Sequence, residues 1–368
     1  FLRLTHVVSA SASVLQHCPQ SLLLPFYFNV PNTVYGLDKG VYLGDREECL
    51  PPSVSLISDA VHSTSNLFVC GECNISYHVR ARLITTTNAK CTAETSRPVI
   101  FVPAHDSPSP PLCVSDFPSE FALDSALSVS SRAYRFLPFR NQLDFSLHTD
   151  EPPPLQLQVG RDKIAFTTVR LRLLCFYPKD SCSRERILAP PPAETFFVVD
   201  STLQASTFFS VVPQDALPKQ GDAESSQLAL NKTTVCPTQT RKLRFSSWEP
   251  VTSMDDHEDK FDDNNKNDDK SARGWQSNAT LIYTYERDDY LVPTFACTYA
   301  SRRYSLSMLL RMDGYGDAKF RLRVPLQIIS VRTSDALETA SQSDGICQRY
   351  TDGAYPDEMN GLPPVYTK

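Results

Sequence analysis

Hydrophobic residues recur at every second position over several short stretches of this chain. Between Ile75 and Leu83 apolar residues alternate with serine, histidine and arginine. Successive side chains of a β-strand point to opposite faces, so this period of two predicts strands with one buried and one solvated face. The predicted strands cover residues 25–31, 75–84, 164–177, 195–199, 279–285, 303–310 and 320–329. Pro325 predicts an edge or bulge position in the last strand, because proline cannot donate a hydrogen bond to a neighbour.

Many such strands in series, separated by turn residues, predict an all-β protein built from antiparallel sandwiches. The length of 368 residues exceeds what one hydrophobic core of ordinary size holds. We therefore predict two tandem immunoglobulin-like β-sandwiches, at 1–138 and 139–334, and a flexible tail at 335–368. The boundary is placed between a serine-rich stretch at 125–131 and the new series of strands that opens at Leu143.

Two polar segments are predicted to be disordered insertions in the second sandwich, at about 214–228 and 254–272. Residues 255–270 hold eight acidic residues and three lysines, a net charge of −5 out of −6 for the whole chain. The rest of the protein is therefore nearly neutral, which argues against a nucleic-acid-binding protein. Asp and Asn could also bind calcium, but the run lacks the fixed glycine and terminal glutamate of an EF-hand loop.

Composition favours a protein that folds in the cytoplasm. No apolar run approaches the roughly 20 residues that cross a bilayer. The 11 cysteines are an odd number without the dense spacing of a disulfide framework, which favours reduced thiols. Three N-x-S/T triplets, at Asn74, Asn231 and Asn278, keep a secreted protein open as an alternative. Asn74 falls in a predicted strand, a poor place for a glycan.

Few residues suggest catalysis. Cys70 and Cys73 form a C-x-x-C, but no second pair follows to complete a zinc site, and the motif leads directly into a predicted strand. The seven histidines are scattered singly, G-x-S-x-G is absent, and Gly314 and Gly316 are typical of a hairpin turn. We therefore predict no enzymatic activity, no cofactor and no metal.

One short motif predicts a binding function. Pro363, Pro364 and Tyr366 form Pro-Pro-x-Tyr in a polar stretch. Consecutive prolines favour a polyproline II helix, which WW domains bind in an aromatic groove with a pocket for the tyrosine. Given 28 prolines and 15 tyrosines, roughly 0.1 such motifs are expected by chance in a chain of this length. The alternative is a proline-rich solubilising segment.

Three stretches of the first half resemble the fungal alpha-arrestins. The family has a "PFxFxLP" strand, an "LPPS" turn and a "YxxxA" strand in this order. This chain has PFYFNVP at 25–31, LPPS at 50–53 and YHVRA at 77–81. The resemblance implies an arrestin-like N-terminal domain.

The second half carries a further resemblance to the same family. VPTF at 292–295 and SRRYSL at 301–306 are similar to the "LPSF…sR.Y.L" stretch before the last hairpin of the C-terminal domain. Residues 320–329 match the closing strand. The acidic insertion and the Ser/Pro-rich stretch before residue 120 depart from the pattern.

The resemblance implies a cytoplasmic adaptor. Its sandwiches would engage cytoplasmic regions of membrane transporters or receptors, and its Pro-Pro-x-Tyr would recruit a WW-domain HECT-type ubiquitin ligase. Such a protein is recruited to the plasma membrane and endosomes, which allows peripheral membrane association. Two alternatives stay open: an arrestin-fold sorting scaffold that needs no ligase, and a secreted β-sandwich binding protein.

Overall fold

The computed structural model divides the chain into two units that are described separately. One is Pro52–Val331, and the other combines Phe1–Pro51 with Arg332–Lys368. The structure describes residues 30, 33–34, 48–58, 71–84, 91–104, 114–130, 142–158, 164–176, 191, 195–214, 216–224, 228–251, 274–286, 291–313 and 318–331. The unit that contains Phe1–Pro51 has one described antiparallel pair, β1 (Thr33–Val34) with β2 (Glu48–Cys49).

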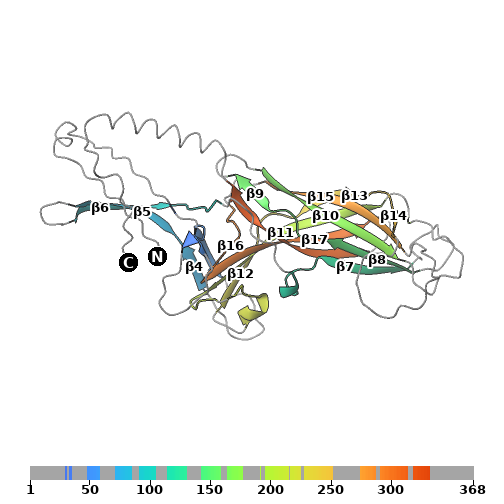
Figure 1. The fold of residues 1–368 in the computed structure, drawn as a ribbon, viewed down its shortest axis with the longest axis horizontal. Helices are drawn as coiled ribbons and strands as arrows, with labels where there is room; N and C mark the ends of the chain where they lie inside the picture. Colours follow the sequence, from blue (N-terminus) through green and yellow to red (C-terminus); the bar gives the residue numbers. More distant parts are fainter. Residues whose placement is uncertain are drawn as a thin grey trace, which may run out of the picture. The chain divides into compact units, whose positions relative to one another are not determined.

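Five described strands of the unit Pro52–Val331 form an antiparallel sheet (Figure 1). Across the sheet they are β14 (Glu249–Val251), β15 (Gly274–Glu286), β10 (Ile164–Phe176), β8 (Gln142–Thr149) and β7 (Asp124–Ser130). The two longest, β10 and β15, pair along their whole length, from Ile164 opposite Glu286 to Phe176 opposite Gly274. Strand β10 alternates buried and accessible residues along its length, as its sequence predicts.

Six described strands form a second antiparallel sheet in the same unit. They are β12 (Leu228–Thr234), β11 (Phe196–Ser210), β17 (Ala300–Met312) and β16 (Phe295–Cys297), with β13 (Gln239–Arg244) paired to β11 and β18 (Lys319–Leu326) paired to β17. On one side β18 pairs with β17. On its other side the described residues form a single bridge, between Arg323 and Ala122, so Pro325 lies near a sheet edge as predicted.

One hydrophobic core joins the two sheets. Its buried residues include Leu171 and Tyr283 from the first sheet and Leu306 and Phe320 from the second. Each fully buried side chain of this size contributes about 1.5–3 kcal/mol relative to an exposed one. A hydrogen bond also connects the two sheets. The Gln239 side chain on β13 donates from Nε2 to the backbone oxygen of Thr284 on β15, at 2.6 Å. The two sheets are therefore faces of one folded body.

Three shorter pairs complete the unit. They are β3 (Val54–Ser58) with β4 (Gly71–Ile75), β5 (Tyr77–Ile84) with β6 (Cys91–Val99), and β9 (Leu155–Gln158) with β19 (Ile328–Val331), the last one parallel. Strands β3 and β4 reach the second sheet through a small cluster that includes Val54, Cys73 and Phe209. Two short 3₁₀ helices, η1 (Val114–Asp116) and η4 (Gln220–Glu224), are the helical elements of the described residues. In the described ranges no helix combines the length and apolar composition needed to cross a bilayer.

The all-β prediction is confirmed at the level of antiparallel sheets, with differences in detail. The serine-rich stretch at 125–131, which precedes the predicted boundary, lies mostly in β7, because its small residues alternate in burial around Leu127 and Val129. Strand β7 pairs with β8 across the predicted boundary at 138, which itself lies outside the described residues. Within the predicted insertion at 214–228, the Pro218 carbonyl contacts the second sheet, where it accepts a hydrogen bond from Arg303. On β5 the predicted apolar face is partly buried at Tyr77 and Val79, whereas its second half is open to solvent and Leu83 is 64% exposed.

Candidate functional site: a buried arginine–glutamate pair beside a basic pocket

Most of the candidate residues from the sequence lie outside the described residues. This holds for Pro363, Pro364 and Tyr366, and for the acidic run at 255–270. The predicted WW-binding motif therefore stays a prediction, and the acidic segment stays without a structural account.

The C-x-x-C stretch is described only from Gly71 onward. Cys73 is a free, buried thiol on β4, and burial raises its pKa. A side chain at Gly71 would place its Cβ 2.8 Å from Cε2 of Phe209, so the glycine allows β4 to pack closely against β11. A packing role accounts for these two residues. Among the described residues, no group of three or more His, Cys, Asp or Glu is placed to hold a metal ion.

A buried ion pair is the main polar feature of the described fold. Arg303, on β17, donates from Nε to Oε2 of Glu120 at 2.8 Å and from Nη2 to Oε1 at 2.5 Å. The Arg303 side chain is 6% exposed and that of Glu120 is 3% exposed. Burial lowers the pKa of Arg303, and its bonds to Glu120 counteract this effect. The two-point geometry is the strongest that arginine makes with a carboxylate.

Two loop segments hold this pair in place. Glu120 follows η1, where its backbone N–H donates to the Phe117 carbonyl at 3.0 Å. From the other segment, the backbone N–H of Gln220 donates to Oε1 of Glu120 at 2.9 Å, and the Pro218 carbonyl accepts a bond from Arg303 at 2.6 Å. The ion pair therefore links three regions that lie far apart in the sequence.

Aromatic rings enclose the same guanidinium. The Arg303 Cζ lies 4.7 Å from the ring centroid of Phe117 and 4.3 Å from that of Phe208. Both distances fall within the range of cation–π attraction. The rings also keep water away from the pair, which strengthens its electrostatic attraction.

The neighbouring Arg302 makes a different set of contacts. It is buried and donates from Nε to the Tyr304 hydroxyl and from Nη1 to the Thr207 hydroxyl, both at 2.8 Å. The Tyr304 hydroxyl in turn donates to the backbone oxygen of Val292. Burial raises the pKa of Tyr304, and Arg302 partly opposes the change. This chain of bonds joins β17 to the segment before β16.

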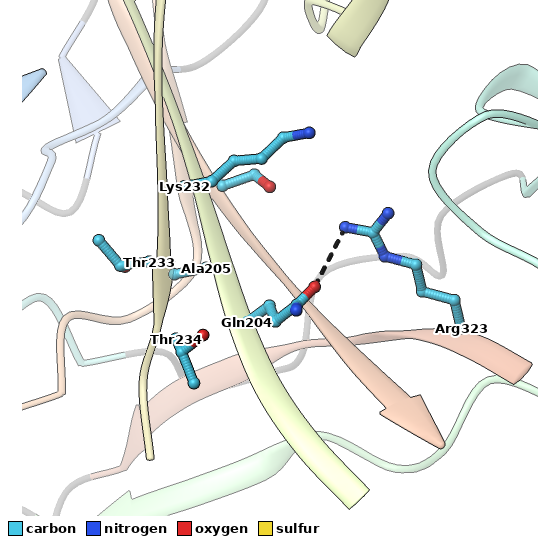
Figure 2. Close-up of a pocket in the computed structure, with 7 residues that line it drawn as sticks. Gln204, Ala205, Lys232, Thr233, Thr234 and Arg323 are labelled. Carbon is cyan, nitrogen blue, oxygen red and sulfur yellow. Dashed lines mark hydrogen bonds between the residues drawn. The ribbon is translucent and has the colours of Figure 1, made fainter. Parts of the chain in front are cut away.

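A small polar pocket of about 90 Å³ lies on the second sheet. It is lined by Gln204, Ala205, Ser206, Lys232, Thr233, Thr234 and Arg323. Figure 2 shows the Lys232 side chain above Gln204 and Arg323 to its right, with the dashed bond from Arg323 to the Gln204 side chain at 3.4 Å. Burial lowers the pKa of Lys232 and the charge of Arg323 lowers it further, while Glu120 opposes both effects. Two cations therefore share the walls of one pocket.

Comparison with known proteins finds no family model that matches the chain and no curated protein that is significantly similar to it.

The sequence reasoning missed this site, although one signal was present. Arg302 and Arg303 stand side by side in a strand whose alternation predicts burial on one face. Two adjacent charges in such a strand require at least one buried polar partner. The partner Glu120 lies 183 positions away and could not be identified from a single sequence.

Proposed function

We propose that the chain is a non-enzymatic, arrestin-like adaptor that links membrane-protein cargo to a WW-domain HECT-type ubiquitin ligase. The observation that carries the proposal is the Pro-Pro-x-Tyr motif of Pro363, Pro364 and Tyr366 in a chain whose described body is all-β. The ligase would ubiquitinate the cargo, which is then internalised and sorted in endosomes. The adaptor acts by raising the effective concentration of cargo near the ligase and catalyses nothing itself.

The arrangement of the sheets supports this proposal at the level of architecture. Two antiparallel sheets that share one core fit a β-sandwich of the immunoglobulin-like kind. We propose that this body is the C-terminal arrestin-like sandwich at 139–334 together with β7. The segments before it would belong to the N-terminal sandwich at 1–138.

The residues that carry the family resemblance also contact each other. Tyr304, from the SRRYSL stretch, donates to the carbonyl of Val292, from the VPTF stretch. Thr294, from the same stretch, binds the backbone of Ile328 through both its backbone N–H (2.8 Å) and its hydroxyl oxygen (2.9 Å). These three stretches therefore act as one structural unit, which supports treating their resemblance as a single signal.

Calorimetry with a peptide tests the proposal. A peptide covering residues 357–368 is titrated into a panel of WW domains from ubiquitin ligases, beside the same peptide with Tyr366→Ala. We expect micromolar affinity, about −8 kcal/mol, that depends on the tyrosine. Absence of binding to every domain would remove the ligase from the proposal.

A further inference from the structure

The outer face of the second sheet carries two adjacent rows of polar residues. Lys232 on β12, Ser206 on β11 and Arg303 on β17 are register partners across three neighbouring strands. Directly opposed residues of paired strands share a face, so these three side chains lie on the same side of the sheet. The row therefore has a cation at each end and a hydroxyl in the middle.

The second row places another cation beside the first. Gln204 on β11 stands opposite Thr234 and Ser305. Arg323, from β18, reaches diagonally over this row, with Nε 3.3 Å from the Ser305 hydroxyl and Nη2 3.4 Å from Oε1 of Gln204. The pocket lies between Arg323 and Lys232.

The carboxylate of Glu120 already bonds to groups other than Lys232 and Arg323. The carboxylate of Glu120 makes both of its short bonds to Arg303 and accepts a third from the backbone of Gln220. Lys232 donates to the neutral amide oxygen of Gln220 at 2.8 Å. Among the described residues, neither Lys232 nor Arg323 forms an ion pair with a carboxylate. The two cations at the pocket are thus left with weak, neutral acceptors.

The pocket is large enough for a ligand bigger than one water molecule. A single water needs about 10–15 Å³ of the space that the 90 Å³ measures, so a compact polyatomic ion fits. Lys232 lies on the accessible side, which leaves an entry path.

We propose that this pocket binds a phosphate-type dianion between Lys232 and Arg323, with the Ser206 and Thr234 hydroxyls as additional donors. The ammonium acts as a point charge and the guanidinium as a planar donor pair, a combination suited to the several oxygens of phosphate. Free phosphate and a phosphate monoester share this chemistry. The inference stands on the pocket alone and does not depend on the proposed adaptor function.

Isothermal titration of the full chain with inorganic phosphate, at constant ionic strength maintained with chloride, tests the site. We expect saturable binding that Lys232→Gln and Arg323→Gln each weaken by about tenfold or more, since each removes a charged hydrogen bond. The matched controls are Lys242→Gln on β13 and Arg172→Gln on β10, which carry exposed cations elsewhere and should bind phosphate as the unchanged chain does. O-phosphoserine in place of phosphate shows whether the ester form is accepted.

Three results would overturn the site: no saturation with either phosphate compound, full binding by Lys232→Gln, or equal losses in the control variants. Because Lys232 is exposed, its glutamine variant should fold normally, which circular dichroism can check. Binding of WW domains is measured separately, so a chain that binds them and not phosphate loses this inference and keeps the proposed function.

Discussion

Replacing Glu120 with alanine leaves the Arg303 guanidinium buried without its carboxylate. The change removes the bonds at 2.8 and 2.5 Å and leaves the backbone N–H of Gln220 without its acceptor. Removing one partner of a buried ion pair costs about 3–5 kcal/mol. The carbonyl of Pro218 and the rings of Phe117 and Phe208 still contact the guanidinium, so we expect the lower end, about 3 kcal/mol.

Urea unfolding followed by tryptophan fluorescence measures this loss. The two tryptophans of the chain, Trp248 and Trp275, pack against the main core and report on its unfolding. The matched control is Glu249→Ala. Glu249 is exposed and accepts one bond, at 3.4 Å, from the Gln276 side chain. We expect the control to change the free energy of unfolding by less than about 0.5 kcal/mol.

A double variant separates the lost pair from the unpaired charge. Glu120→Leu with Arg303→Met replaces both charges by apolar groups, which is often close to neutral for buried pairs. We expect the double variant to be more stable than Glu120→Ala although it carries more changes. A loss below about 0.5 kcal/mol for Glu120→Ala, or a double variant less stable than the single one, would refute the reasoning.

The cysteines give two further predictions. Alkylation of the native chain mapped by mass spectrometry should label exposed Cys91 well before buried Cys175 and Cys236; early labelling of the buried thiols would contradict the core described above. Burial and Asp144 raise the pKa of Cys175 from 9.0 to about 12. The folded state therefore holds this proton more tightly than the unfolded chain does, and its contribution to stability is complete below pH 9 and lost as pH rises towards 12. Between pH 8 and pH 10.5 this group should lower the free energy of unfolding by about 2 kcal/mol, and Cys175→Ala should lose that part of the pH dependence; identical slopes for both chains would show that the thiol is not desolvated.

The long alternating strands could be predicted from the sequence. The sequence predicts a strand at 164–177 and β10 spans Ile164–Phe176, because apolar residues alternate with arginine at 169–173 and the flanking residues are apolar or threonine, which favour strands. Strand β7 was missed, since serine and alanine at its accessible positions are typical of loops and only Leu127 and Val129 mark its buried face.

The site depends on contacts that a single sequence does not encode locally. Glu120 and Arg303 belong to segments that look unremarkable by themselves, and their pairing follows from how β17 and the loop after η1 meet in the fold. Pro218 and Gln220 lie in a stretch whose polar composition predicts disorder, yet their backbone groups satisfy this buried pair. Composition describes average behaviour and does not show which backbone groups will bond to one buried ion pair.

Recruitment of a WW-domain ubiquitin ligase through Tyr366 is the proposal for this chain. Its most direct test is calorimetric titration of the intact chain and its Tyr366→Ala variant with the WW domains that bind the isolated peptide. We expect the intact chain to bind with an affinity within about tenfold of the peptide, a difference of about 1.4 kcal/mol, and the variant not to bind. An intact chain that fails to bind, or a variant that binds as tightly as the unchanged protein, would contradict it.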